Sequence, residues 1–298
     1  MNRTMLVASA TLVGCALALP LLVETSNADP AGSAADPAAE TPTETPVEIA
    51  RREYEEVLRQ TPDVERGREV YLTCAVCHLP EGWGSADGRY PQIAGQLRTV
   101  IIKQLADFRA GNRENPLMYP FSVPGILGGP QEIADVAAYV SQLPMTADNG
   151  LGPGTDLEAG EALYIEHCAD CHGAAGEGDE AEHIPMIAGQ HFVYLMRQFD
   201  AIRNGERKNA DAGMIDAIQE LAPAEQEAVL DYTARLRPAA EKLAQEGWLN
   251  PDFPHYLRDA MGLRARPPAV QWKEQAPASR SRPESRSGSS PESPSAAP

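Results

Sequence analysis

Two short motifs carry the residues whose types and spacing could do chemistry. Each is a pair of cysteines separated by two other residues and followed directly by a histidine: Cys74-Ala75-Val76-Cys77-His78 and Cys168-Ala169-Asp170-Cys171-His172. This order suits covalent attachment of haem, because two thiols on one turn can form thioether bonds to the haem vinyl groups while the adjacent imidazole faces the iron. We therefore predict two haem c groups, with His78 and His172 as iron ligands.

Other uses of paired cysteines fit the sequence less well. A thioredoxin-like redox pair would need a βαβ context, and no segment shows sustained period-two alternation. A zinc site built from all four motif cysteines would explain neither the histidine after each pair nor the position of each pair in its own repeat. Haem attachment through Cys74, Cys77, Cys168 and Cys171 is the favoured interpretation.

The chain repeats itself at an offset of 94 residues. The offset places the first motif on the second, Pro91-Gln92-Ile93-Ala94-Gly95-Gln96 on Pro185-Met186-Ile187-Ala188-Gly189-Gln190, and Arg113-Glu114-Asn115 on Arg207-Lys208-Asn209. It also maps Gly67 onto Glu161 and Tyr71 onto Ile165. Two homologous domains, 61–146 and 147–238, are therefore expected, with a Gly/Pro-rich linker at 143–156.

Apolar residues recur at three- and four-residue spacing in both repeats, which predicts an all-α fold. Units of this size bury little core by themselves, so each domain is expected to wrap around its haem. The expected helices are 64–72, 97–108 and 131–143 in the first repeat and 157–165, 192–202 and 223–236 in the second.

The second axial ligand of each iron is sought among methionine and histidine. Met118 lies 40 residues after His78, and Met214 lies 42 residues after His172. Both methionines follow the repeated Arg-x-Asn segment and precede the last helix of their repeat, so we predict both as iron ligands. Met196 is expected in a core, and the weaker alternative ligands are His183 and His191.

A haem-ligating histidine normally donates its second ring N–H to a neighbouring acceptor, which fixes the tautomer and the ring orientation. Pro91 and Pro185 each lie 13 residues after the motif histidine. Their carbonyl groups are candidates for this role, although the two prolines could equally serve only to shape the loop.

Residues 1–28 are typical of a secretory signal peptide. Arg3 precedes an apolar stretch, 5–23, and the small residues Ser26 and Ala28 suit cleavage after Ala28. The stretch could instead remain as a membrane anchor, and Leu12-Val13-Gly14-Cys15 resembles a lipidation site. All three alternatives place the folded part outside the cytoplasm.

The two ends of the chain lack the composition of a core. Residues 29–60 are expected to be a disordered linker, although a charged stretch within 49–60 could form a short helix. Residues 239–298 form a C-terminal extension, expected to be disordered from about 275. Its aromatic segment, 248–257, could pack on a domain or dock a partner.

The charge of the chain argues against a nucleic-acid binder. The 298 residues include 25 Lys and Arg and 43 Asp and Glu, a net charge of -18. Residues 151–238 carry -11 of this charge, whereas 61–150 carry -3. The acidity could steer a basic partner to the second domain, or it could be a general property of the surface.

The two motifs, the tandem repeat and the segments PQIAGQ, PMIAGQ, RAGNRENPLM and RNGERKNADAGM together resemble the di-haem class I c-type cytochromes of the c4 type. The resemblance covers 61–238, and the extension departs from it. It implies two tandem class I cytochrome c domains, each around a covalent haem, with His78 and Met118 ligating the first iron and His172 and Met214 the second.

The resemblance also implies a function. It indicates a periplasmic electron carrier, soluble or tethered to the inner membrane through residues 5–23, that serves redox partners such as a quinol-oxidising complex or a terminal oxidase. His/Met ligation closes both axial positions of the iron, which suits a carrier rather than an enzyme. The alternative is a haem subunit or a catalytic di-haem enzyme, such as a peroxidase or a sulfur-compound dehydrogenase, which would need an open position.

Overall fold

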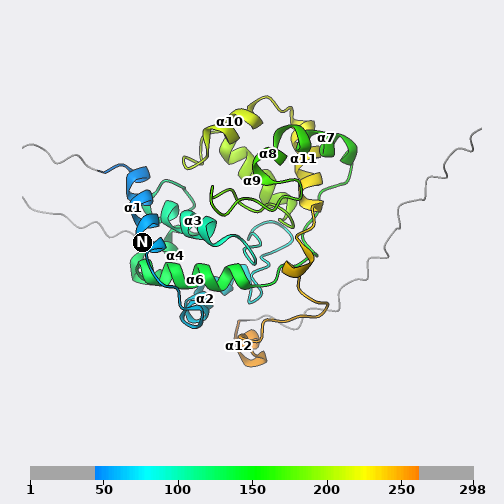
Figure 1. Ribbon diagram of the computed structural model, residues 1–298. Coiled ribbons are helices and arrows are strands. Elements are labelled where there is room, and N and C mark those ends of the chain that lie inside the picture. Colours follow the sequence, from blue (N-terminus) through cyan, green and yellow to red (C-terminus); the bar gives the residue numbers. More distant parts are fainter. Residues whose placement is uncertain (1–43, 262–298) are drawn as a thin grey trace, which may run out of the picture. The chain divides into compact units, whose positions relative to one another are not determined.

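A computed structural model describes residues 44–261 of the chain (Figure 1). Within that part the structure is helical, and β structure is confined to two isolated bridges, one between Met145 and Leu243 and one between Asp179 and Ile184. The predicted all-α fold is confirmed.

The helices follow the two repeats. The helices expected from the periodicity are α2, α3 and α6 in the first repeat and α7, α9 and α11 in the second. The described helices are α1 (Pro46–Leu58), α2 (Val64–His78), α3 (Arg98–Ala110), α4 (Tyr119–Ser122), α5 (Pro124–Leu127), α6 (Pro130–Gln142), α7 (Leu157–His167), α8 (Ala169–His172), α9 (Phe192–Arg203), α10 (Ala212–Gln219), α11 (Pro223–Arg235), the 3₁₀ turn Ala240–Lys242 and α12 (His255–Ala260).

In each repeat the first and last long helices cross at a glycine. A Cβ on Gly67 of α2 would lie 2.1 Å from the carbonyl oxygen of Asp135 in α6, and a Cβ on Gly160 of α7 would lie 2.2 Å from that of Ala228 in α11. Because any side chain would overlap the facing backbone, glycine alone permits this approach. The two crossings are structurally equivalent.

This equivalence corrects the sequence alignment before the motifs. Gly67 corresponds to Gly160 at an offset of 93, not to Glu161. Likewise Tyr71 corresponds to Tyr164, not to Ile165, because each hydroxyl donates to the carbonyl oxygen of the residue after the motif at 2.7 Å.

One additional residue before Cys168 accounts for the shift in register. In the first repeat α2 runs without a break through the motif to His78. In the second, α7 ends at His167, Cys168 leaves the helical conformation with φ -120°, and the short helix α8 carries the rest of the motif. The register returns to 94 once the extra residue has been accommodated.

Helix α1 contradicts part of the expected linker. The prediction that 29–60 is disordered is wrong for residues 46–58, which form this helix, whereas 29–43 lie outside the described residues. The alternative, a short helix within 49–60, is confirmed for residues 49–58. Thr45 and Glu48 form a capping box at its start. Its buried Val57 packs into the core of the first repeat, so α1 is a part of that domain.

The extension also belongs to the first domain. Phe253 is 1% exposed and lies in the core of the first repeat, and Trp248 packs against the same core. Packing on a domain, one of the two expectations for the aromatic segment, is therefore confirmed. The segment expected to be disordered, 275–298, lies outside the described residues.

Each repeat has its own apolar core. One core gathers residues of α1, α2, α3, α6 and the extension, and the other gathers residues of α7, α9, α10 and α11. Across residues 44–261, no helix combines the length and apolarity that a membrane crossing requires. The predicted signal segment, 1–28, lies outside this range.

Candidate haem sites

The two motif histidines are held in the same way. The Nδ1 atoms of His78 and His172 lie 3.0 Å from the carbonyl oxygens of Pro91 and Pro185, respectively. A carbonyl oxygen accepts only, so each Nδ1 carries the proton and each Nε2 keeps a lone pair for a metal. The predicted role of the two proline carbonyls is confirmed.

Burial favours the neutral form of both rings. His78 is 5% exposed and His172 8%. Removal from water lowers the pKa of each imidazole, and the hydrogen bond to the proline carbonyl opposes this only in part. A neutral imidazole with a free Nε2 is the form that ligates iron.

The motif cysteines are unpaired, as thioether attachment requires. Burial raises the pKa of Cys74 to about 12 and that of Cys168 to about 11. In residues 44–261 no three or more His, Cys, Asp or Glu side chains converge to hold a metal ion.

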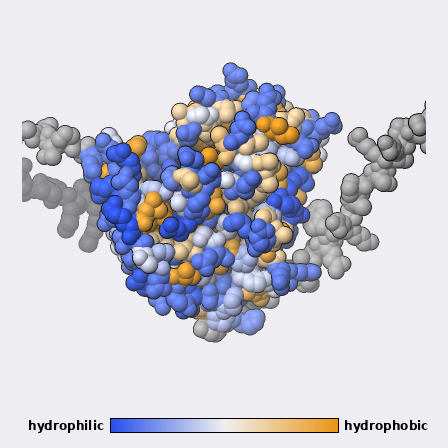
Figure 2. All heavy atoms as spheres, in the orientation of Figure 1, coloured by the Kyte–Doolittle hydropathy of each residue, from blue (hydrophilic) through white to orange (hydrophobic). Residues whose placement is uncertain are grey.

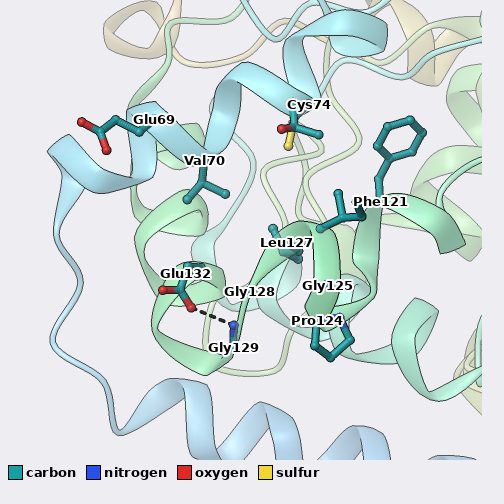
Figure 3. Close-up of a pocket in the computed structure, with 12 residues that line it drawn as sticks. Glu69, Val70, Cys74, Phe121, Pro124, Gly125, Leu127, Gly128, Gly129 and Glu132 are labelled. Atoms are coloured by element: carbon teal, nitrogen blue, oxygen red, sulfur yellow. Dashed lines mark hydrogen bonds between the residues drawn. The ribbon is translucent and has the colours of Figure 1, made fainter.

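A pocket of about 670 Å³ opens beside Cys74 (Figure 3). Its walls come from α2, α4, α5 and the start of α6, and Val70, Phe121 and Leu127 give it an apolar lining around the thiol. Glu69, Thr73 and Glu132 add polar groups to its wall, so the cavity beside this unpaired motif cysteine has a mixed lining.

The two predicted methionine ligands occupy equivalent turns. The Oδ1 atom of Asn115 accepts from the backbone N–H groups two and three residues later, the second being that of Met118 at 3.2 Å. The Oδ1 atom of Asp211 does the same, with Met214 at 3.2 Å. Met118 therefore directly precedes α4, and Met214 lies in the first turn of α10.

The surroundings of the two methionines differ. Exposed apolar side chains surround Met118 in sequence: Leu117, Tyr119, Phe121 and Ile126. Exposed carboxylates surround Met214: Asp211, Asp216 and Glu220. Figure 2 shows one face of the molecule, on which scattered apolar residues lie among hydrophilic ones.

The other candidate ligands have different roles. His191 is 2% exposed, with Nδ1 accepting from Gly150 N–H at 3.0 Å and Nε2 donating to Trp83 O at 2.7 Å. His183 bonds the Tyr54 hydroxyl through Nδ1. Met196 packs against the second core, as expected.

Glutamines that sequence reasoning did not single out join the two domains. The Gln96 side chain bonds both the N–H and the carbonyl of Met186, at 3.0 and 2.9 Å. The Gln190 side chain bonds both backbone groups of Gln92, at 3.0 and 2.9 Å. Each clamped residue directly follows the proline that holds a motif histidine. The repeated Gly-Gln was visible in the sequence, but its partner across the domains was not.

Two arginines of the repeated Arg-x-Asn segment also meet between the domains. Arg113 donates to Gln104, Gln198 and the Tyr194 hydroxyl, and Arg207 donates to the same two glutamines. Burial lowers the pKa of Arg207 to about 9. Guanidinium groups with mainly neutral partners are suited to hold a carboxylate.

These features define a class: an all-α protein with two tandem domains, each presenting the attachment motif, a motif histidine held by a proline carbonyl and a methionine in an Asx turn. The cytochrome c family model matches residues 64–144 and 157–236, which is more than half of the chain. The chain belongs to the cytochrome c family, and it carries two covalently bound haem c groups.

The relatives narrow the class to the c4 type. Cytochrome c4 of Azotobacter vinelandii is 32% identical over 167 residues, covering 51% of this chain and 78% of its own length. A thiosulfate dehydrogenase electron acceptor of Stutzerimonas stutzeri is 33% identical over 175 residues, covering 55% and 79%. The crystal structure of reduced Pseudomonas stutzeri cytochrome c4 has a TM-score of 0.54 at 26% identity, covering 59% of this chain and all of that one. The chain is thus a di-haem electron carrier like cytochrome c4.

Proposed function

We propose that the chain carries electrons between periplasmic redox proteins through two His/Met-ligated haems, His78 with Met118 and His172 with Met214. The observation that carries the proposal is the pair of equivalent turns that place Met118 and Met214 after matching Asx acceptors. Haem iron supplies one-electron chemistry when bound, and two protein ligands leave it no position for a substrate.

The residues of the chain perform the remaining tasks. The carbonyls of Pro91 and Pro185 orient the imidazoles. The side chains of Gln96 and Gln190 hold the loop after each proline against the other domain. Fixed ligands keep the structural change on electron transfer small. Burial of the two motif histidines favours the less charged, reduced state.

Separate substitution of Met118 and Met214 by Ala tests the ligand assignment. Each change is expected to remove the methionine–ferric absorption band of one haem and to lower the reduction potential of that haem alone. Met196→Leu is the matched control, because Met196 packs in the second core without a predicted ligand role. If neither alanine change altered a haem, the axial assignment would be wrong.

The identity of the electron donor is a second part of the proposal. Two relatives are named thiosulfate dehydrogenase electron acceptors, which favours a sulfur-compound dehydrogenase as donor over a quinol-oxidising complex. The same names support a role as the haem subunit of such an enzyme. The acidic surface around Met214 suits a basic partner, and the apolar surface around Met118 suits a second one.

Reduction kinetics separate these donors. A thiosulfate dehydrogenase is expected to reduce the chain quickly at low salt and more slowly at high salt, since attraction to exposed carboxylates is screened. Asp216→Asn together with Glu220→Gln should reduce that salt dependence. Fast reduction by a quinol-oxidising complex alone would overturn the choice of donor. N-terminal sequencing of the mature protein tests periplasmic export with cleavage after Ala28.

A further inference from the structure

The residue that follows the first motif has a strained backbone. Leu79 has φ 66° and ψ 160°, a region that is accessible essentially to glycine alone. At the equivalent position of the second domain, Gly173 has φ 82° and ψ 158°. Both domains thus need the same unusual turn directly after the proximal histidine, but only the first makes it with a side chain present.

The C-terminal extension contacts the loop that contains this strain. The Asn250 side chain donates to Pro80 O at 2.6 Å, and Asn250 N–H lies 3.3 Å from Glu81 Oε1. The guanidinium of Arg258 pairs with the same Glu81 carboxylate, and both groups are buried. The corresponding residues of the second domain, Ala174 and Ala175, are exposed.

The extension also supports the tyrosine that holds Leu79. The Tyr71 hydroxyl donates to Leu79 O at 2.7 Å. The ring of Phe253 meets the Tyr71 ring edge to face, with centroids 6.0 Å apart. Asn250 also donates to the Tyr139 hydroxyl, which in turn donates to Asp252, both at 2.9 Å. Two routes, one through the Pro80 carbonyl and the Glu81 side chain and one through Tyr71, therefore lead from the extension to the strained residue.

We propose that residues 245–261 form a clamp that keeps the strained turn at Leu79 in place and thereby positions His78 toward the first haem. Asn250 and Arg258 are the positioning residues of this clamp. A strained conformation persists only where its surroundings over-determine it, and the extension supplies contacts that the second domain does not need. The inference rests on His78 as an iron ligand, and it assigns the extension to the first haem alone.

Loss of the clamp has a specific consequence. With its support removed, Leu79 relaxes toward negative φ, the adjacent His78 shifts from the Pro91 carbonyl, and the proximal side of the first haem becomes wetter. Greater hydration favours the oxidised, more highly charged state. The reduction potential of the first haem therefore falls, while that of the second stays unchanged.

A double-mutant cycle on the full-length, haem-loaded chain tests the clamp. Asn250→Ala leaves buried acceptors unpaired. It is therefore expected to lower the ratio of folded to unfolded first domain about tenfold and to lower the reduction potential of the first haem. In the Leu79→Gly background, where no strain needs support, the potential change on Asn250→Ala is expected to be at most about a third of that in the Leu79 chain. Glu246→Ala, at an exposed site of the same segment, is the control and leaves both haems unchanged.

Several outcomes would overturn the clamp. One is a first-haem potential that stays at its original value in a folded Asn250→Ala chain. Another is an equal potential change in both backgrounds, which would mean that the extension only adds stability. If Asn250→Ala fails to fold, Arg258→Lys, which keeps a positive charge beside Glu81, replaces it under the same criteria. Failure of His78 ligation is distinguishable, because the first haem of the unaltered chain would then lack a low-spin spectrum.

Discussion

The two haem domains share their attachment geometry and differ in what covers it. In both, the motif histidine donates to a proline carbonyl at 3.0 Å, and a tyrosine hydroxyl donates to the carbonyl after the motif at 2.7 Å. In the first, the following Leu-Pro-Glu loop lies beneath the extension, whereas in the second Gly-Ala-Ala is largely open to solvent. The repeated elements therefore set the chemistry, and segments without a counterpart set its environment.

The two domains also differ in the surface around the predicted methionine ligand. Apolar side chains surround Met118 and carboxylates surround Met214. Two domains with one internal plan and two different surfaces suit a carrier that receives electrons on one side and delivers them on the other.

The largest expected effects come from the helix crossings. Gly67→Ala and Gly160→Ala each place a methyl group on a facing carbonyl oxygen, and each should destabilise its own domain by about 3 kcal/mol. Because α1 and the extension bury Val57 and Phe253 in the core of the first domain and have no counterpart in the second core, the Gly160→Ala chain should unfold first on heating. Circular dichroism combined with haem absorbance measures both transitions.

Gly125→Ala is the control for the glycine pair. Among the described residues, and apart from its chain neighbours and the backbone of its own helix, no heavy atom lies within 4 Å of the position that a Cβ on Gly125 would take, and the φ of this glycine is not positive. Stability of Gly67→Ala or Gly160→Ala equal to that of this control would show that the close helix contacts do not exist in solution.

A smaller difference in stability is expected between substitutions of Gln190 and Gln96, whose side chains join the two domains. Gln190→Ala leaves both backbone groups of Gln92 without partners in a buried site and should cost about 2 kcal/mol. Gln96→Ala opens a half-buried site, where water can replace the lost bonds, and should cost about 1 kcal/mol. Denaturant unfolding at constant m-value measures both, with the exposed Gln219→Ala as control. A larger loss for Gln96→Ala would reverse the expected order.

The smallest expected effect is on the pH dependence of stability, and it concerns the residues that follow the two glutamines, Leu97 and His191. Burial lowers the pKa of His191 below its ordinary value of 6.5, whereas Leu97, its counterpart, does not titrate. The folded state favours the neutral ring, so the contribution of His191 to stability is complete above pH 6.5 and is lost as the pH falls through the lower folded pKa.

The pH dependence of unfolding tests this difference. His191→Leu should flatten the fall in the free energy of unfolding between about pH 7 and about pH 5, the range in which a histidine titrates. The comparison uses the slope of each chain, because the variant also loses two hydrogen bonds. Equal slopes in the two chains would mean that His191 does not titrate differently on folding.

The sequence predicted most of what the repeats share. The order of Cys, Cys and His encodes attachment locally, and the spacing to Pro91 and Pro185 was enough to nominate the carbonyl partners. Six long helices followed from their periodicity. The register before the motif was missed because one additional residue ahead of Cys168 moves Gly160 and Tyr164 to an offset of 93.

The parts that escaped prediction depend on contacts distant in sequence. Helix α1 was expected only as a possible short helix within 49–60; its capping box, Thr45 and Glu48, is local, whereas the burial of Val57 in the first core is not. The partner of Asn250 lies about 170 residues earlier, and the strain at Leu79 follows from a turn that only the second repeat makes with glycine. Neither feature has a local signature.

The central claim is that two haems with closed axial positions make this chain an electron carrier. A spectroscopic redox titration of the unmodified chain, followed by addition of peroxide, tests it most directly. The account predicts two low-spin haems, each with a methionine–ferric band, that exchange one electron each and do not bind peroxide rapidly. Rapid binding of peroxide at one haem, with a missing methionine band, would contradict it and indicate an enzyme.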